Sequence, residues 1–150
     1  MPVKTLFDNI EIRFATSDIY ISASLQKIDY ELDLAIIKVE NPGAKPTKTR
    51  TGKPCEGEKV YAIGNARNYG ISIIEGMVSQ AEIVVTADGK TMTAIQCDLN
   101  ITEGSSGGAL FDAQGRLVGI TTFRLKDKLG NVIYGMSFAI PVSIVIEFLL

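Results

Sequence analysis

The sequence predicts an all-β protein of antiparallel strands, arranged in barrels or sandwiches, with one short helix at the C-terminal end. Two observations carry this prediction. Short stretches of alternating apolar and polar residues recur along the chain, and clusters of turn-forming residues separate them. A helical start is indicated only at Pro141, because proline suits a first helical position and the apolar stretch 142–150 follows it.

The first part of the chain predicts three strands and then a linker. In the first strand apolar residues alternate with Glu11 and Arg13, whereas the third is more continuously apolar and therefore more buried. We expect strands at 10–14, 19–25 and 34–39. Residues 1–40 would thus form a first lobe, and 41–58, which holds three of the five prolines and several basic residues, a solvated link between lobes.

From Val60 onward the strand pattern resumes and predicts a second lobe over 59–150. The stretch 71–81 allows one long strand or two short ones bent at Gly76, and Asp88 and Gly89 occupy a hairpin turn that requires positive φ. The remaining predicted strands cover 60–63, 82–86, 90–96, 109–111, 116–123 and 132–140. We expect residues 60–140 to form a six-stranded barrel.

Bulk composition narrows the classes of function. With 46% hydrophobic and 21% charged residues the chain has the composition of a globular domain, and its net charge of −2 gives no general attraction to nucleic acid or anionic membranes. No apolar run is long enough for a membrane-spanning helix. The two cysteines, Cys55 and Cys97, are too few for a disulfide framework and leave a single bridge open. No metal or other cofactor is implied.

The glycine- and serine-rich stretch 104–108 is the strongest functional signal. It lies at a bend between two predicted strands, where a serine can be lifted out as a nucleophile. Glycines before that serine let two backbone N–H groups point at one spot, as an oxyanion hole requires. Taken alone, however, such a cluster is more often a plain turn.

This stretch resembles the G-x-S-G-G motif of chymotrypsin-fold serine proteases, and its surroundings resemble their HtrA/Deg-type branch. Four further stretches match in order and extend the resemblance over nearly the whole chain: 33–39, 57–65, 75–79 and 137–141. The resemblance implies two antiparallel β-barrel lobes, of which the N-terminal one is incomplete in this chain.

The same resemblance implies a set of site residues. Ser106, rather than Ser105, is the nucleophile, because two glycines follow it, and the N–H groups of Gly104 and Ser106 form the oxyanion hole. Asp33 is the triad aspartate, with Asp29 and Glu31 as nearby alternatives. By the same resemblance, four residues contact substrate: Asn100 at the floor of a specificity pocket, and Thr121, Thr122 and Phe123 on a strand that pairs with an extended peptide.

The chain contains no histidine, so its own residues cannot complete a Ser-His-Asp triad. By resemblance, that histidine belongs to a segment upstream of Met1. We therefore expect a fragment of a longer protease, with a split-gene product and a pseudoenzyme as alternatives. The expected function is serine endopeptidase activity through an acyl-enzyme on Ser106, inactive in this chain alone. The alternative function is that of a pseudoprotease that binds extended peptides by strand addition.

The expected partners are polypeptide substrates, with a homo-oligomer left open. The resemblance points to a periplasmic or extracytoplasmic location without deciding it.

Overall fold

The computed structural model describes residues 9–40, 43–87, 89–102, 104–126 and 129–150. The chain divides into two compact units, Met1–Pro46 and Thr47–Leu150. The division falls inside the stretch 41–58, which the composition marks as a link.

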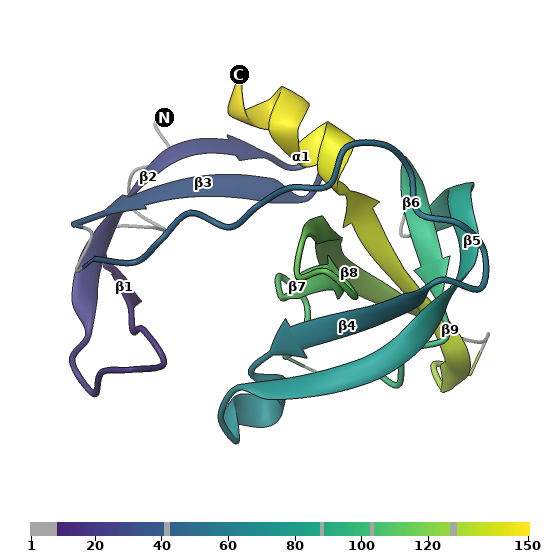
Figure 1. The fold of residues 1–150 in the computed structure, drawn as a ribbon, viewed down its shortest axis with the longest axis horizontal. Coiled ribbons are helices and arrows are strands. Elements are labelled where there is room, and N and C mark those ends of the chain that lie inside the picture. Colours follow the sequence, from purple (N-terminus) through teal and green to yellow (C-terminus); the bar gives the residue numbers. More distant parts are fainter. Residues whose placement is uncertain (1–8, 41–42, 88, 103, 127–128) are drawn as a thin grey trace. The chain divides into compact units, whose positions relative to one another are not determined.

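The first unit is a three-stranded antiparallel sheet (Figure 1). Its strands, in the order β1-β2-β3, are β1 (Ile10–Ile12), β2 (Ile21–Asp29) and β3 (Leu34–Val39). The three strands lie where the sequence predicts them, but β2 continues to Asp29 instead of ending at Leu25. A shift in the β2–β3 register between Leu25 and Lys27 accompanies this extension.

One face of this sheet is apolar and remains partly exposed. Ala23 lies opposite Ile10 on one side and Val39 on the other, and residues opposite each other share a face. This face also carries Ile12, Ile21, Leu25 and Ile37. None of these seven side chains is fully buried, and Ile37 is 42% exposed. Within the described residues the first unit is therefore an open three-stranded sheet, and its assignment as the remainder of an N-terminal barrel stays a prediction.

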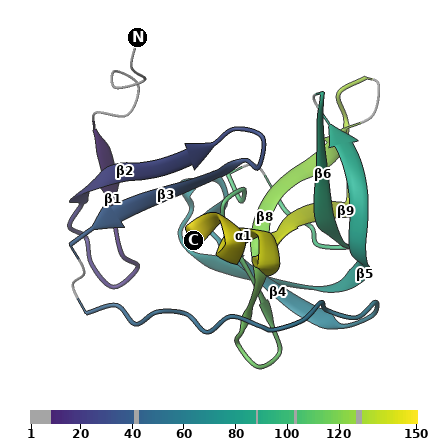
Figure 2. The same ribbon diagram turned by 90° about the horizontal axis from the view of Figure 1, so that it is seen from above.

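The second unit is a closed six-stranded antiparallel barrel in the order β4-β5-β6-β9-β8-β7 (Figure 1). Its strands are β4 (Lys59–Gly64), β5 (Ser72–Ala87), β6 (Lys90–Cys97), β7 (Ala109–Asp112), β8 (Leu117–Lys126) and β9 (Val132–Pro141). A 3₁₀ turn, η2 (Ala66–Asn68), precedes β5. The helix α1 (Val142–Leu149) follows β9 and packs on β8 and β9 (Figure 2). The six-stranded barrel and the terminal helix confirm the predicted fold class.

Strand β5 is a single strand that runs through Gly76 and includes the separately predicted strand 82–86. It pairs with β6 as a long hairpin (Figure 2). A Cβ atom at Gly76 would lie 2.6 Å from Leu99 Cδ2 and 2.9 Å from Asp98 Oδ1. Glycine is therefore needed at this position because the chain leaving β6 packs against it. Asp98 Oδ1 also accepts the N–H of Met77 at 2.6 Å.

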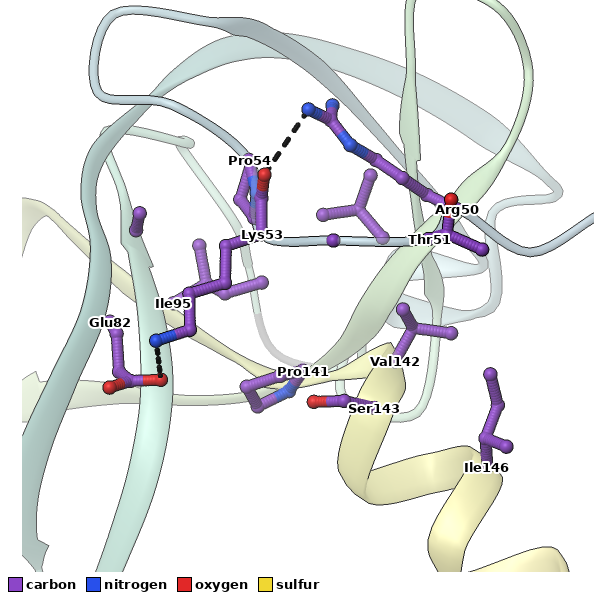
Figure 3. Close-up of a pocket in the computed structure, with 13 residues that line it drawn as sticks. Arg50, Thr51, Lys53, Pro54, Glu82, Ile95, Pro141, Val142, Ser143 and Ile146 are labelled. Carbon is purple, nitrogen blue, oxygen red and sulfur yellow. Dashed lines mark hydrogen bonds and ion pairs between the residues drawn. The ribbon is translucent and has the colours of Figure 1, made fainter.

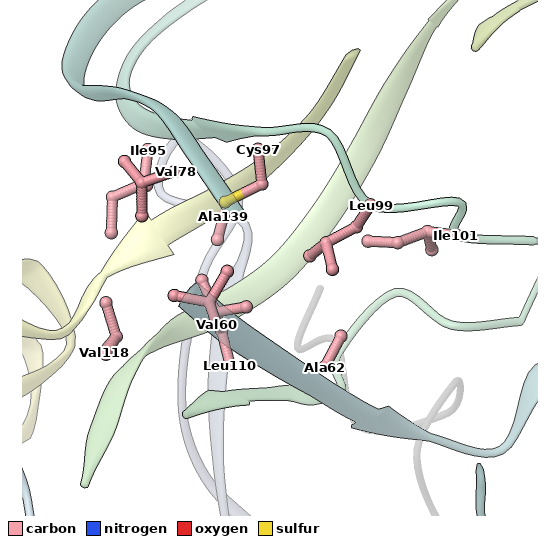
Figure 4. Close-up of a cluster of buried hydrophobic side chains, with 10 residues drawn as sticks. All are labelled: Val60, Ala62, Val78, Ile95, Cys97, Leu99, Ile101, Leu110, Val118 and Ala139. Atoms are coloured by element: carbon pink, nitrogen blue, oxygen red, sulfur yellow. The ribbon is translucent and has the colours of Figure 1, made fainter. Parts of the chain in front are cut away.

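The barrel interior is filled by small and branched side chains from all six strands and from the chain after β6 (Figure 4). The buried cluster comprises Val60, Ala62, Val78, Ile95, Cys97, Leu99, Ile101, Leu110, Val118 and Ala139. Alternation along each strand directs these residues inward. The packed interior supports the loop between β6 and β7, which carries the candidate nucleophile.

The second half of the linking stretch is attached to the barrel. The Leu117 N–H donates to Lys48 O at 2.7 Å, and the Arg50 N–H donates to Leu117 O at 3.0 Å. The Arg50 side chain is only 14% exposed and pairs with the carboxylates of Glu58 and Asp112. The expectation that the basic residues of this stretch are solvated is therefore wrong for Arg50, since two acidic partners draw it inward.

Candidate active site

The serine loop, residues 104–108, depends on its glycines for its shape. Gly104 and Gly107 have φ of 84° and 86°, in the left-handed region that side chains rarely adopt. Gly108 is constrained by space instead, because a Cβ atom there would lie 2.5 Å from the carbonyl oxygen of Ile63. The loop thus lies so close to β4 that only glycine fits at position 108.

The two serines of the loop lie in different environments. Ser105 is buried, with 8% of its surface exposed, whereas Ser106 is exposed. The Ser106 hydroxyl donates to the carbonyl oxygen of Thr122 on β8. Of these two hydroxyls, only that of Ser106 lies on a solvent-accessible residue and can meet an incoming substrate.

Strand β8 supports the loop from the barrel side. Thr121 is 3% exposed, and its hydroxyl donates to Ser105 O at 2.7 Å. The Gly107 N–H donates to Thr121 O at 2.7 Å, and the Thr121 N–H donates to Gly108 O at 2.9 Å. This anchoring role of Thr121 was not predicted, because a threonine within a strand gives no local signal for it.

Beyond Thr121 the β7 side of β8 has no strand partner within the described residues. The last pair between β7 and β8 is Ala109 with Ile120. Thr122 is buried and continues β8 together with Phe123, whose side chain lies outside the described part of the structure. Pairing of an extended peptide with this strand at Thr121, Thr122 and Phe123 stays a prediction.

Asp33 ends the turn between β2 and β3 and is exposed, with φ of 56°. Its neighbour Asp29 has a structural role, since its Oδ1 accepts the N–H groups of Glu31 at 2.9 Å and Leu32 at 3.0 Å. Asp33 belongs to the first unit and Ser106 to the second, so that their placement in a shared site stays a prediction.

Asn100 is exposed between two buried residues, Leu99 and Ile101. Its place at the floor of a specificity pocket stays a prediction, as does the oxyanion hole formed by the N–H groups of Gly104 and Ser106.

A separate cavity of about 520 Å³ lies within the second unit (Figure 3). Its lining includes Pro54 and the start of α1, and the Lys53 Nζ to Glu82 Oε2 ion pair of 2.7 Å also lies there. No residue of the serine loop lines it. This cavity is therefore a different feature from the candidate active site.

Both cysteines are free, which settles the disulfide left open by the sequence. Cys97 is buried in the barrel core, and burial raises the pKa of its thiol to about 12. Within the described residues no cluster of three or more metal-ligating side chains is present.

Comparison with known proteins identifies the family. Residues 9–120 match the family described as "Trypsin-like peptidase domain". This chain belongs to the trypsin-like peptidases. Its similarity to HtrA-type members of that family spans nearly the whole chain.

Among curated trypsin-like peptidases of this type, the serine endoprotease DegS of Haemophilus influenzae is 32% identical over 139 residues, covering 91% of this chain and 41% of that protein. The chloroplastic protease Do-like 5 of Arabidopsis thaliana is 32% identical over 125 residues, covering 80% and 39%. The solved HtrA-type protease AlgW with decapeptide superposes with a TM-score of 0.83 at 31% identity, covering 97% and 44%. The chain thus spans less than half the length of these relatives. No helix of the described residues is long and apolar enough to cross a membrane.

Proposed function

We propose that this trypsin-like peptidase chain supplies the nucleophile and the oxyanion hole of a serine endopeptidase. That enzyme cleaves peptide bonds through an acyl-enzyme on Ser106. In this mechanism the Ser106 hydroxyl attacks the scissile carbonyl and loses its proton to a base. The base passes that proton to the leaving amine as the peptide C–N bond breaks, and water then hydrolyses the acyl-enzyme. The N–H groups of Gly104 and Ser106 stabilise the negative charge that develops on the carbonyl oxygen. That base is the imidazole of a histidine from outside these 150 residues, and Asp33 holds it in position.

The observation that carries this proposal is the exposed Ser106 on a glycine-shaped loop that the barrel anchors on both sides of it. The edge of β8 beyond Thr121, where the pairing with β7 has ended, supports extended peptides as substrates. The relative AlgW was solved with a decapeptide, which agrees with that substrate class.

A histidine base has to come from outside these residues, because the chain contains no histidine. We therefore expect the 150-residue chain by itself to hydrolyse peptides hardly at all. Proteases that lack a triad member retain only a rate of about 10³–10⁴ over water, from the oxyanion hole and substrate binding.

A fluorophosphonate probe tests this function directly. We expect the chain to be labelled barely above a Ser106→Ala control, and added imidazole, acting as an external base, to raise labelling at Ser106. Ser143→Ala, which removes an exposed serine from α1, is the matched control and should label like the unaltered chain. Strong labelling without imidazole that is lost in Ser106→Ala would show that another residue already acts as base.

The second candidate is a non-catalytic peptide-binding protein. Two observations favour it: the absence of histidine, and the Ser106 hydroxyl donating to Thr122 O instead of to a base. In that case labelling stays at the Ser106→Ala level with imidazole as well, while extended peptides still bind. The response of labelling to imidazole thus distinguishes the two functions. Isothermal titration with an uncharged peptide, similar in length to the decapeptide solved with AlgW, tests the binding that the second function requires.

The role of Asp33 makes a geometric prediction. In a structure of this chain with the two units placed, the Asp33 carboxylate and the Ser106 hydroxyl should face one cleft, about 6–9 Å apart, leaving room for an imidazole with two ordinary hydrogen bonds. Direct contact, or side chains facing away from each other, would rule out Asp33 as the triad aspartate.

A further inference from the structure

Thr121 contacts the serine loop on both sides of Ser106. Its hydroxyl donates to Ser105 O at 2.7 Å and also lies 3.2 Å from Gly108 O. Its carbonyl accepts the Gly107 N–H, and its N–H donates to Gly108 O. Because the hydroxyl has one hydrogen, the shorter contact to Ser105 O is the stronger bond. Thr121 therefore holds the carbonyl of the residue that directly precedes the candidate nucleophile.

Holding that carbonyl fixes the direction of the next N–H group. The Ser105 carbonyl and the Ser106 N–H belong to one planar trans peptide unit, so they point in opposite directions. The carbonyl points inward, because Thr121 Oγ1 and the Gly108 N–H, at 3.1 Å, both donate to it. The Ser106 N–H therefore points away from β8, toward the exposed side of the loop.

We propose that Thr121 is a positioning residue, whose hydroxyl orients the Ser105–Ser106 peptide so that the Ser106 N–H can act as an oxyanion donor. This role rests on the proposed peptidase function. The backbone N–H and carbonyl of Thr121 already bond to the loop.

Three variants separate this role from general packing. Thr121→Val keeps the shape of the side chain and removes the hydroxyl, whereas Thr121→Ser keeps the hydroxyl. Thr91→Val is the matched control, because Thr91 is exposed on β6 of the same unit and its hydroxyl bonds to that of Thr86 at 2.9 Å. All three are made in the full 150-residue chain.

The first measurement is amide hydrogen exchange by NMR and needs no activity. We expect Thr121→Val to speed exchange at Gly107 and Gly108 roughly five- to tenfold, the effect of losing one hydrogen bond. Thr121→Ser should restore the slow rate, and Thr91→Val should leave it unchanged. Unchanged exchange in Thr121→Val, or equal acceleration in Thr91→Val, would overturn the proposal.

The second measurement is the rate of fluorophosphonate labelling at Ser106 with added imidazole. We expect Thr121→Val to label at least about tenfold more slowly, because losing one oxyanion donor costs about 10²–10³ in rate. Thr121→Ser should label within about threefold of the unaltered chain, as expected if the hydroxyl makes the contact. Loss of labelling in both variants would overturn the proposal. If the unaltered chain itself fails to label, the proposed function fails, and hydrogen exchange still decides whether Thr121 anchors the loop.

Discussion

Replacing Asp112 by asparagine should destabilise the barrel unit strongly. Asp112 is 1% exposed at the end of β7. Its Oδ1 accepts the N–H groups of Gln114 at 3.0 Å and Arg116 at 2.9 Å, and its Oδ2 accepts Arg116 Nε at 2.9 Å. Arg50 Nη1 lies 3.6 Å from Oδ2. The carboxylate thus joins the linking stretch, β7 and the start of β8.

The size of the effect follows from the interactions that an asparagine side chain cannot make at this position. The amide oxygen can still accept the two backbone N–H groups, but the charge-assisted bond from Arg116 and the attraction to the largely buried Arg50 disappear. A hydrogen bond to a charged group contributes about 1.5–3 kcal/mol, and the 40% exposure of the Arg116 side chain places its share at the low end. We expect a loss of about 2–3 kcal/mol in unfolding free energy. For a unit of this size this lowers Tm by roughly 10–20 °C.

The same carboxylate makes stability depend on pH. Burial acts to raise the pKa of Asp112, but the hydrogen bonds from Arg116 and Gln114 outweigh burial, so that its pKa lies below the usual value. A lowered pKa in the folded state stabilises at pH above the unfolded value of about 3.9. This stabilisation is lost as pH falls through the folded value. The difference between the unaltered chain and Asp112→Asn should therefore be largest near neutral pH and shrink in acid.

Urea unfolding of the unaltered chain and Asp112→Asn, followed by far-UV circular dichroism at about pH 7 and about pH 3, measures both effects. Glu75→Gln is the matched control, since its ion pair with Lys59 spans 3.0 Å between two exposed side chains on neighbouring strands. It should leave the unfolding midpoint unchanged. A change below about 0.5 kcal/mol for Asp112→Asn at neutral pH, as for an ordinary surface substitution, would refute the reasoning. So would a difference that stays the same size in acid.

Two further predictions concern the serine loop and the cysteines. Gly108→Ala should cost about 1–3 kcal/mol in unfolding free energy and abolish imidazole-dependent labelling, because its Cβ atom would collide with Ile63 O. Gly107→Ala should cost about 1 kcal/mol, because a Cβ atom there meets open space and only the positive φ is unfavourable. Equal costs for the two variants would contradict the steric argument. Ellman's reagent at about pH 8 should modify Cys55 in the folded chain and Cys97 only after unfolding, because the Cys97 thiol is buried and has a pKa of about 12. Modification of two thiols in the folded chain would contradict the burial of Cys97.

The strands and the serine loop were predictable because their signals are local. Alternation within a few residues decides which face of a strand is buried, and the turn residues at 87–89 mark the hairpin between β5 and β6. The glycines of the serine loop are a similar local signal, because Gly104 and Gly107 adopt a left-handed φ that only glycine adopts without strain. The absence of histidine needs no structure at all, since it follows from composition.

Contacts between residues distant in the chain were decided only by the tertiary structure. Arg50 becomes a largely buried partner of Asp112 because the linking stretch pairs with the start of β8, and no pattern near Arg50 indicates that pairing. Thr121 anchors the serine loop because β8 lies against it in the closed barrel. The physical reason is the same in both cases: a strand pattern reports which side of a strand is buried, whereas the partner of each polar group depends on which strands the closing barrel brings together.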